Sequence, residues 1–298
     1  MNKTIKIVVV GLLTLAGLVA ALAYTASALA DHKAHRIVSV AATEVAFASD
    51  EASVRRGRYL FESRGCMHCH GADGGGRAFI DDPKGLYVKS PNITGGGVVQ
   101  DYTERDWERA IRHGVKPSGE PLLIMPSADF NRLTDEDLAA VVAYVRSLPA
   151  ASGTAAQIRL PLIVKALYAV GVVQDAAEKI DHSLPPSQPI PAAATSQYGA
   201  YVANSCIGCH GASLSGGKIP GGPPSWPAAA NLTPGSESVM PRYDTPEKFV
   251  AMMRSGERPD GSAVNRAMPF ETLAVMSEND LRAVYAYLGT LPPRAHGR

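Results

Sequence analysis

The chain has 298 residues, of which 46% are hydrophobic and 19% charged, and it carries 29 lysines and arginines against 28 aspartates and glutamates. This composition supplies enough apolar residues for folded cores and excludes a disordered or collagen-like chain. The near-zero net charge lacks the basic field that binding to phosphate backbones requires, so no nucleic-acid partner is expected. At roughly 100 to 200 residues per domain, the length predicts two domains.

Residues 1–30 form the first predicted element, an apolar helix. Lys3 and Lys6 are its only charges, and no charged side chain occurs from Ile7 to Ala30. A bilayer span needs about 20 apolar residues, so this run is long enough for an uncleaved anchor, while Ala28-Leu29-Ala30 also offers a signal-cleavage site. Both interpretations place the rest of the chain on the periplasmic side of a bacterial inner membrane. It is either anchored there or soluble after cleavage near Ala30.

The rest of the chain contains an internal duplication. Residues 66–72 read Cys-Met-His-Cys-His-Gly-Ala, and residues 206–212 read Cys-Ile-Gly-Cys-His-Gly-Ala. Three further matches follow in the same order in both halves: Asn-x-Thr at 92 and 231, Met-Pro at 125 and 268, and a closing segment that ends at Pro149 or Pro292. We therefore expect two domains of one kind, over residues 50–150 and 196–293.

Each repeat is expected to be mostly α-helical. Thr134 and Ser277 are the expected N-cap residues of the closing helices, and the segments that begin at Thr103 and Thr245 are also expected to be helical, with Pro246 at a first helical position. In the two closing helices an acid, Asp137 or Asp280, can fold back onto the cap. Gly114 and Gly256 are placed for the left-handed conformation that ends a helix. Strand alternation is weak throughout, and no βαβ pattern occurs.

Residues 151–195 are predicted to link the two domains. The link ends in a proline-rich stretch, and its middle, Leu160 to Val173, is apolar apart from Lys165. That run is too short to span a bilayer. We expect a helix packed between the two domains, because the run lacks the strongly polar face of an interfacial helix. A position at the membrane surface is the alternative.

The duplicated motif, Cys-x-x-Cys-His in an exported chain, is typical of c-type haem attachment. Its two thiols can bond the two vinyl groups of one haem, while the adjoining histidine faces the iron. The expected attachment residues and histidine ligands are Cys66, Cys69, His70, Cys206, Cys209 and His210. A four-thiolate zinc site or a redox-active dithiol is the alternative, but it leaves the histidines and the rest of each repeat unexplained. Two covalently bound haem c groups are therefore predicted.

Methionine on the other face of each iron would raise its reduction potential. Apart from Met67, inside the attachment turn, the first repeat offers only Met125. Met268 occupies the matching position in the second repeat, whereas Met240 has no counterpart. The remaining methionines are expected to pack in helices: Met252, Met253 and Met276.

Several other side chains could bind the iron or pack around the haems. Three histidines are rival ligands for which surface or core roles are expected: His68, His113 and His182. Four aromatic residues at matched positions are expected to pack around the haems: Tyr59, Trp107, Tyr201 and Phe249.

With these motifs and the closing Asp-Leu-x-Ala-Val-x-Ala-Tyr helix, the chain resembles the membrane-anchored di-haem cytochromes c that accompany periplasmic dehydrogenases. The resemblance covers roughly residues 55–149 and 197–292. It implies an all-α fold of two tandem cytochrome c domains after the N-terminal helix. The chain is also similar to the cytochrome subunits of alcohol and gluconate dehydrogenases, but those carry three haems and this chain has two motifs.

The resemblance implies an electron carrier between a dehydrogenase or other donor and a terminal oxidase, cytochrome or other acceptor. The alternative is a di-haem enzyme of the peroxidase or thiosulfate dehydrogenase type, which needs an exchangeable iron position. All four cysteines lie in the attachment motifs, and each repeat has a methionine in register. Both facts favour the carrier.

Overall fold

The computed structural model describes residues 2–220, 222, 225–235 and 237–298. Its long helices are α1 (Lys3–Ala34), α2 (Glu51–Ser63), α4 (Glu104–His113), α5 (Asp135–Ser147), α9 (Pro246–Ser255) and α11 (Glu278–Leu288). The short ones are α3 (Cys66–His70), α6 (Leu162–Ala169), α7 (Ser196–Ala203), α8 (Ile207–His210) and α10 (Phe270–Leu273). The strands are β1 (Ala78–Asp81), β2 (Tyr87–Lys89) and β3 (Gln157–Arg159). The described part is therefore mostly helical with little sheet, as the sequence predicts.

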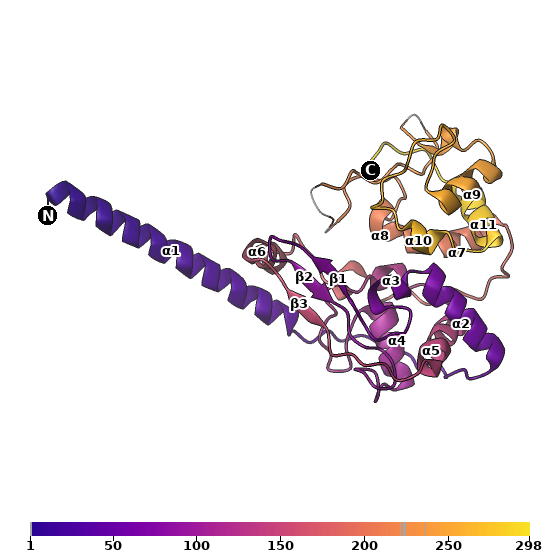
Figure 1. Cartoon of the computed structure of the whole chain (residues 1–298), viewed down its shortest axis with the longest axis horizontal. Coiled ribbons are helices and arrows are strands. Elements are labelled where there is room, and N and C mark those ends of the chain that lie inside the picture. Colours follow the sequence, from indigo (N-terminus) through magenta and orange to yellow (C-terminus); the bar gives the residue numbers. More distant parts are fainter. Residues whose placement is uncertain (1, 221, 223–224, 236) are drawn as a thin grey trace.

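The two repeats fold in the same way, side by side (Figure 1). In the first, α2 crosses α5, and in the second, α7 crosses α11. Each crossing has a glycine at its closest point, because a Cβ at Gly57 would overlap the carbonyl oxygen of Ala140 and a Cβ at Gly199 that of Ala283. Each domain encloses its own hydrophobic core, so burial of apolar side chains stabilises each unit separately.

The predicted helix ends agree with the structure where the signals are local. Gly114 and Gly256 adopt φ values of 65° and 74°, the left-handed conformation expected of a residue that ends a helix. Thr103 and Asp106 form a complete capping box at the start of α4. In the closing helices Thr134 and Ser277 are N-caps as expected, and each side chain accepts from the backbone N–H of the acid three residues on. The acids do not take the cap N–H groups, because these bond to tyrosine hydroxyls of the opposite domain.

The small antiparallel sheet has the order β1-β2-β3 and packs part of the linking segment onto the first domain. Its strands of three or four residues are too short to show alternation in the sequence. The expected helix in the linking segment forms as α6, but it packs along the end of α1 and not between the two domains. Lys165 explains the difference, since its ammonium bonds to Ser27 Oγ at 2.9 Å and to Asp31 Oδ1 at 3.0 Å.

Helix α1 is the single helix of the described residues that is long and apolar enough to cross a membrane. It has 32 residues, a mean hydropathy of 2.5 over its most apolar window, and no buried residue in that window. It extends away from both domains (Figure 1). A buried core helix is thereby excluded, and an anchor and a signal sequence both fit this geometry.

Candidate functional site

Each Cys-x-x-Cys-His motif forms a short helical turn: α3 spans the whole motif of the first domain, and α8 begins directly after Cys206 in the second. The first cysteine of each motif, Cys66 or Cys206, packs against the core of its domain. Burial raises the pKa of the Cys66 thiol to about 12 and that of the Cys206 thiol to about 11. Such thiols are protonated at neutral pH and lack the thiolate character of a redox-active dithiol.

The histidine that ends each turn is held in one tautomer. His70 Nδ1 lies 3.2 Å from the carbonyl oxygen of Pro91, and His210 Nδ1 lies 2.9 Å from that of Ala230. Because a carbonyl only accepts hydrogen bonds, Nδ1 carries the proton and Nε2 is left with a free lone pair. Burial lowers the pKa of both imidazoles, which favours the neutral form that binds metals.

The repeated Asn-x-Thr element follows these carbonyl groups directly and fixes them in place. Asn92 Oδ1 accepts from the N–H and the hydroxyl of Thr94, both at 2.8 Å, while its amide donates to the carbonyl of Ala151. Asn231 makes the same contacts with Thr233, and its amide donates to the carbonyl of Arg294. Each asparagine therefore ties the loop that orients the histidine to the chain after the closing helix.

Met125 and Met268 share a backbone conformation as well as a sequence register. The carbonyl of Met125 accepts from Ser127 N at 2.9 Å, and that of Met268 accepts from Phe270 N at 3.0 Å. Both side chains are partly buried against the core that also contacts the attachment cysteine of their domain. Met240 is also partly buried in the second core but begins a 3-10 helix. Three methionines are fully buried, in agreement with their predicted packing role: Met252, Met253 and Met276.

The rival histidines occupy other places. His68 is exposed on the surface of its turn. His113 and His182 contact each other, with their Nδ1 atoms 2.9 Å apart, and His113 also faces Glu108 Oε1 at 3.3 Å. Surface and core roles therefore account for all three. Within the described ranges, no group of three or more His, Cys, Asp or Glu side chains gathers as a metal site, which counts against the shared zinc site.

The two domains meet through contacts that the duplication repeats. The hydroxyl of Tyr59, in the first domain, donates to Asp280 Oδ2 at 2.7 Å and accepts from the backbone N–H of Ser277 at 2.8 Å. It therefore caps the start of α11 in the second domain. This single hydroxyl bonds to Asp280 Oδ2 and to the cap N–H, while Asp280 Oδ1 accepts from the hydroxyl of Ser277 at 3.1 Å.

Tyr201 makes the reciprocal contact. Its hydroxyl donates to Asp137 Oδ2 at 2.6 Å and accepts from Thr134 N at 3.4 Å, at the start of α5 in the first domain. Tyr59 and Tyr201 occupy matched positions, as do the helix ends they cap. Each repeat thus presents the same surface to the other, as in a symmetric dimer interface.

Both attachment motifs lie at this interface. A Cβ at Gly208, within the second motif, would lie 2.8 Å from Asp129 Oδ2 of the first domain. A Cβ at Gly65, just before the first motif, would lie 3.7 Å from Thr272 Cγ2 of the second. The segment after each candidate methionine therefore packs against the attachment motif of the other domain.

One buried ion pair lies between the motifs. Arg64 Nη2 is 2.8 Å from Asp280 Oδ2, and their side chains are 5% and 2% exposed. Burial dominates the raised pKa values of Cys66 and Cys206, but the positive charge of Arg64 acts on both thiols in the opposite direction. Arg64 lies two residues before Cys66 and pairs with Asp280 of the second domain, so the ion pair lies where the two domains meet.

The model of the family described as cytochrome c matches residues 54–149 and again residues 197–292. The chain belongs to the cytochrome c family. Family membership implies covalently bound haem c, and the paired cysteines with a singly protonated histidine in each domain fit that group. Once bound, haem c supplies reversible one-electron chemistry at its iron. One-electron transfer is therefore the chemistry that the two cytochrome c domains are suited to.

Several curated relatives are cytochrome subunits of dehydrogenases. The cytochrome c subunit of alcohol dehydrogenase (quinone) from Gluconobacter oxydans (strain 621H) is 28% identical over 282 residues, which cover 84% of this chain and 57% of that protein. The fructose dehydrogenase cytochrome subunit of Gluconobacter japonicus is 39% identical over 102 residues, 31% of this chain and 21% of the relative. The gluconate 2-dehydrogenase cytochrome c subunit of Pantoea cypripedii is 35% identical over 103 residues, which cover 32% of this chain and 23% of that protein. The matches thus span little more than half of the first relative and under a quarter of the others.

The residues of the domain interface were not predicted as such. Tyr59 and Tyr201 were expected to pack around the haems with Trp107 and Phe249. The last two are buried in their domain cores, whereas the tyrosine hydroxyls bond across the interface. The repeat did contain a signal for these contacts, because both matched positions hold tyrosine, and packing alone does not require its hydroxyl.

We expect Asp280→Asn to weaken the interface strongly. Burial alone would raise the pKa of Asp280, but the charge of Arg64 and the hydrogen bond from Tyr59 hold it below 3.8, so the carboxylate is ionised at neutral pH. Removing its charge leaves the Arg64 cation buried and unpaired, which should cost about 3 to 5 kcal/mol. The unbalanced cation should also raise the reduction potentials. Denaturant unfolding and a redox titration measure the two effects.

Glu278→Gln is the matched control on the same helix. It breaks an ion pair with Arg282 whose side chains are 63% and 33% exposed, so the loss should stay below about 1 kcal/mol. Equal unfolding midpoints for the two variants would show that the Arg64–Asp280 pair does not hold the domains together.

Proposed function

We propose that this cytochrome holds two haem c groups, one in each domain, and relays single electrons between a dehydrogenase and a terminal oxidase or other acceptor. The observation that supports this most strongly is the duplicated motif in which two cysteines precede a histidine whose Nδ1 is hydrogen-bonded to a backbone carbonyl. Proposed attachment and ligand residues are Cys66, Cys69, His70 and Met125 in one domain and Cys206, Cys209, His210 and Met268 in the other.

The protein's own residues perform three tasks in this proposal. The thiols hold the cofactor covalently, so that a small domain retains it outside the cytoplasm. The carbonyls of Pro91 and Ala230 fix each histidine with Nε2 free for iron and raise its basicity as a ligand. The buried cores exclude water from the iron ligands, and a drier environment with methionine ligation raises the potential.

The position of both motifs at one interface supports transfer within the chain. Tyr59 and Tyr201 fix the two domains against each other through the reciprocal caps. Because the attachment motifs pack on that interface from both sides, an electron that enters one domain can pass to the other without dissociation of a partner. We propose residues 50–150 and 196–293 as the two domains and 151–195 as the link.

The proposed donor is a periplasmic dehydrogenase, since the relatives are named as subunits of alcohol, fructose and gluconate dehydrogenases. We propose that residues 1–30 are an uncleaved anchor that holds both domains on the periplasmic side of the inner membrane. The exposed apolar surface along α1 supports this, because it is covered by neither domain.

The function is tested on native protein extracted from washed membranes in mild detergent. A dehydrogenase should co-purify with it, and the substrate of that dehydrogenase should reduce both haems before an added oxidase reoxidises them. A chain that purifies alone and consumes peroxide or thiosulfate would favour the enzyme alternative instead.

A further inference from the structure

Helix α6 and the end of α1 form one paired unit. Helix α6 packs on α1, and the partly or fully shielded small residues near the end of α1 recur at helical spacing: Ala23, Ala26, Ser27, Ala30 and Ala34. These small residues let the two backbones approach closely. Lys165 bonds to Ser27 and Asp31, and Lys33 Nζ donates to the carbonyl of Tyr168 at 2.8 Å.

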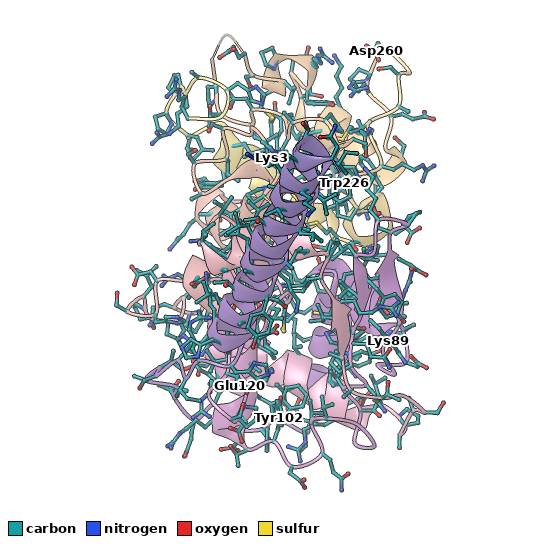
Figure 2. All side chains as sticks on the ribbon, turned by 90° about the vertical axis from the view of Figure 1, so that its left-hand side faces the viewer. Lys3, Lys89, Tyr102, Glu120, Trp226 and Asp260 are labelled. Carbon is teal, nitrogen blue, oxygen red and sulfur yellow. The ribbon has the colours of Figure 1, made fainter. Side chains whose placement is uncertain are left out.

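The two helices run in the same direction. Lys165 contacts α1 at Ser27 and Asp31, and Tyr168, three residues later, contacts it at Lys33. The first turn of α6, with Leu162 and Ile163, is therefore its end nearer to the apolar part of α1. Figure 2 looks at the molecule from the side to which α1 projects, with Lys3 at the near end of that helix.

The depth of this unit follows from the length of α1. A hydrocarbon core of about 30 Å takes roughly 20 helical residues, so a span that begins at Ile7 ends near Ala26. The charged residues Asp31, Lys33 and Arg36 then lie in the headgroup layer. Since α6 lies beside residues 23–34, its first turn falls at the boundary between acyl chains and headgroups.

The side chains at this turn are apolar and exposed. Leu162 is 48% exposed and Ile163 is 67% exposed, although leucine and isoleucine are among the residues most often buried. Val170 and Val172, after the end of α6, are also exposed. In water this cluster would be an unfavourable apolar patch.

We propose that α6 lies in the membrane interface beside α1, with Leu162 and Ile163 in contact with lipid acyl chains. The occupant is lipid because these exposed apolar side chains belong to a helix packed along α1, whose own apolar side chains are exposed and would be covered by the bilayer. The inference rests on the proposed anchor. Its consequence is a second membrane contact, far from α1 in sequence, which stops the first domain from swinging about a single helix and holds its haem site at a fixed height above the membrane.

The test uses the full chain in liposomes of phosphatidylethanolamine and phosphatidylglycerol that contain a lipid with a photoactivatable diazirine near the end of one acyl chain. After illumination, trypsin releases residues 160–165, with Leu162 and Ile163, and residues 166–179, with Val170 and Val172. Mass spectrometry then measures the label in each peptide. We expect label in 160–165, less in 166–179, and strong label in the peptides of α1.

Residues 267–282 are the matched control, because this tryptic peptide carries Val275, which is 42% exposed and belongs to the second domain. It should remain unlabelled. The variant Leu162→Ser with Ile163→Ser, which alters exposed side chains only, should lose the label of its 160–165 peptide.

The outcomes separate this inference from the anchor proposal. Label in α1 without label in 160–165 would overturn the membrane contact of α6 and leave the anchor standing. Equal label in 160–165 and 267–282 would also overturn it. A native chain that begins at Asp31 would overturn the anchor and, with it, the inference.

Discussion

Replacing Cys66 and Cys69 by alanine should leave one haem per chain, attached in the second domain. Each domain has its own attachment turn and its own hydrophobic core, so the loss of one thioether pair does not remove the other. The pyridine haemochrome absorbance per chain should fall by half, and the intact mass should fall by one haem. Cys206→Ala with Cys209→Ala should give the mirror result.

His68→Ala is the control for the first of these variants. His68 lies in the same turn as Cys66 and Cys69 but is exposed and carries no thiol, so both haems should remain. Retention of two covalent haems after loss of Cys66 and Cys69 would contradict the assignment of one haem to each motif. Loss of both would mean that the second domain folds around its cofactor only when the first is loaded.

The sequence predicted those parts of the fold that depend on neighbours along the chain. The N-caps Thr134 and Ser277 and the left-handed glycines Gly114 and Gly256 are satisfied within one or two helical turns, so their residue types alone identify them. The duplication extended this local information to two domains. The attachment turns followed for the same reason, since cysteines and histidine lie within five residues.

The sequence could not predict contacts made between distant segments. Asp280 Oδ1 accepts from the hydroxyl of Ser277, three residues before it, but Oδ2 accepts from Tyr59, 221 residues away in the chain. The tyrosine hydroxyl and the Arg64 cation complete the bonding of this buried carboxylate, and neighbouring residues in the sequence indicate neither of them. The same limit applies to α6, whose apolar pattern indicated a partner without indicating that the partner is α1.

The Asn-x-Thr element of the candidate site was predictable in one respect and not in another. Asn-x-Thr was visible as a repeat, but its purpose depends on where the preceding carbonyl points. The structure explains the repetition, because Asn92 and Asn231 each hold the loop whose carbonyl orients a histidine. Repetition of a polar element between two haem motifs is thus a usable signal for a residue that positions a ligand.

The last prediction concerns the iron ligands. Met125→Ala and Met268→Ala should each remove the sulfur-to-iron charge-transfer band of one haem and open that iron to added cyanide. The potential of that haem should fall by about 0.1 V or more, within the roughly 0.8 V over which axial ligands set haem potentials. The other haem should be nearly unaffected, since each methionine packs against the core of its own domain. The absorbance spectrum of the oxidised protein measures the band, the spectral change on addition of cyanide measures access to the iron, and a redox titration followed in the main haem bands measures the potential.

Met240→Ala distinguishes ligation from packing. Met240 and Met268 are both partly buried in the second core and both precede proline, so loss of either thioether removes similar apolar contacts. Their backbones differ, because Met240 begins a 3-10 helix while Met268 repeats the conformation of Met125. Ligation by Met268 therefore predicts that Met240→Ala leaves both spectra intact.

Loss of the band in Met240→Ala would instead assign the ligand to Met240. A high-spin iron in the unmodified protein that binds peroxide readily would mean that one position is open to substrate, and the enzyme alternative would then explain the chain better than an electron relay.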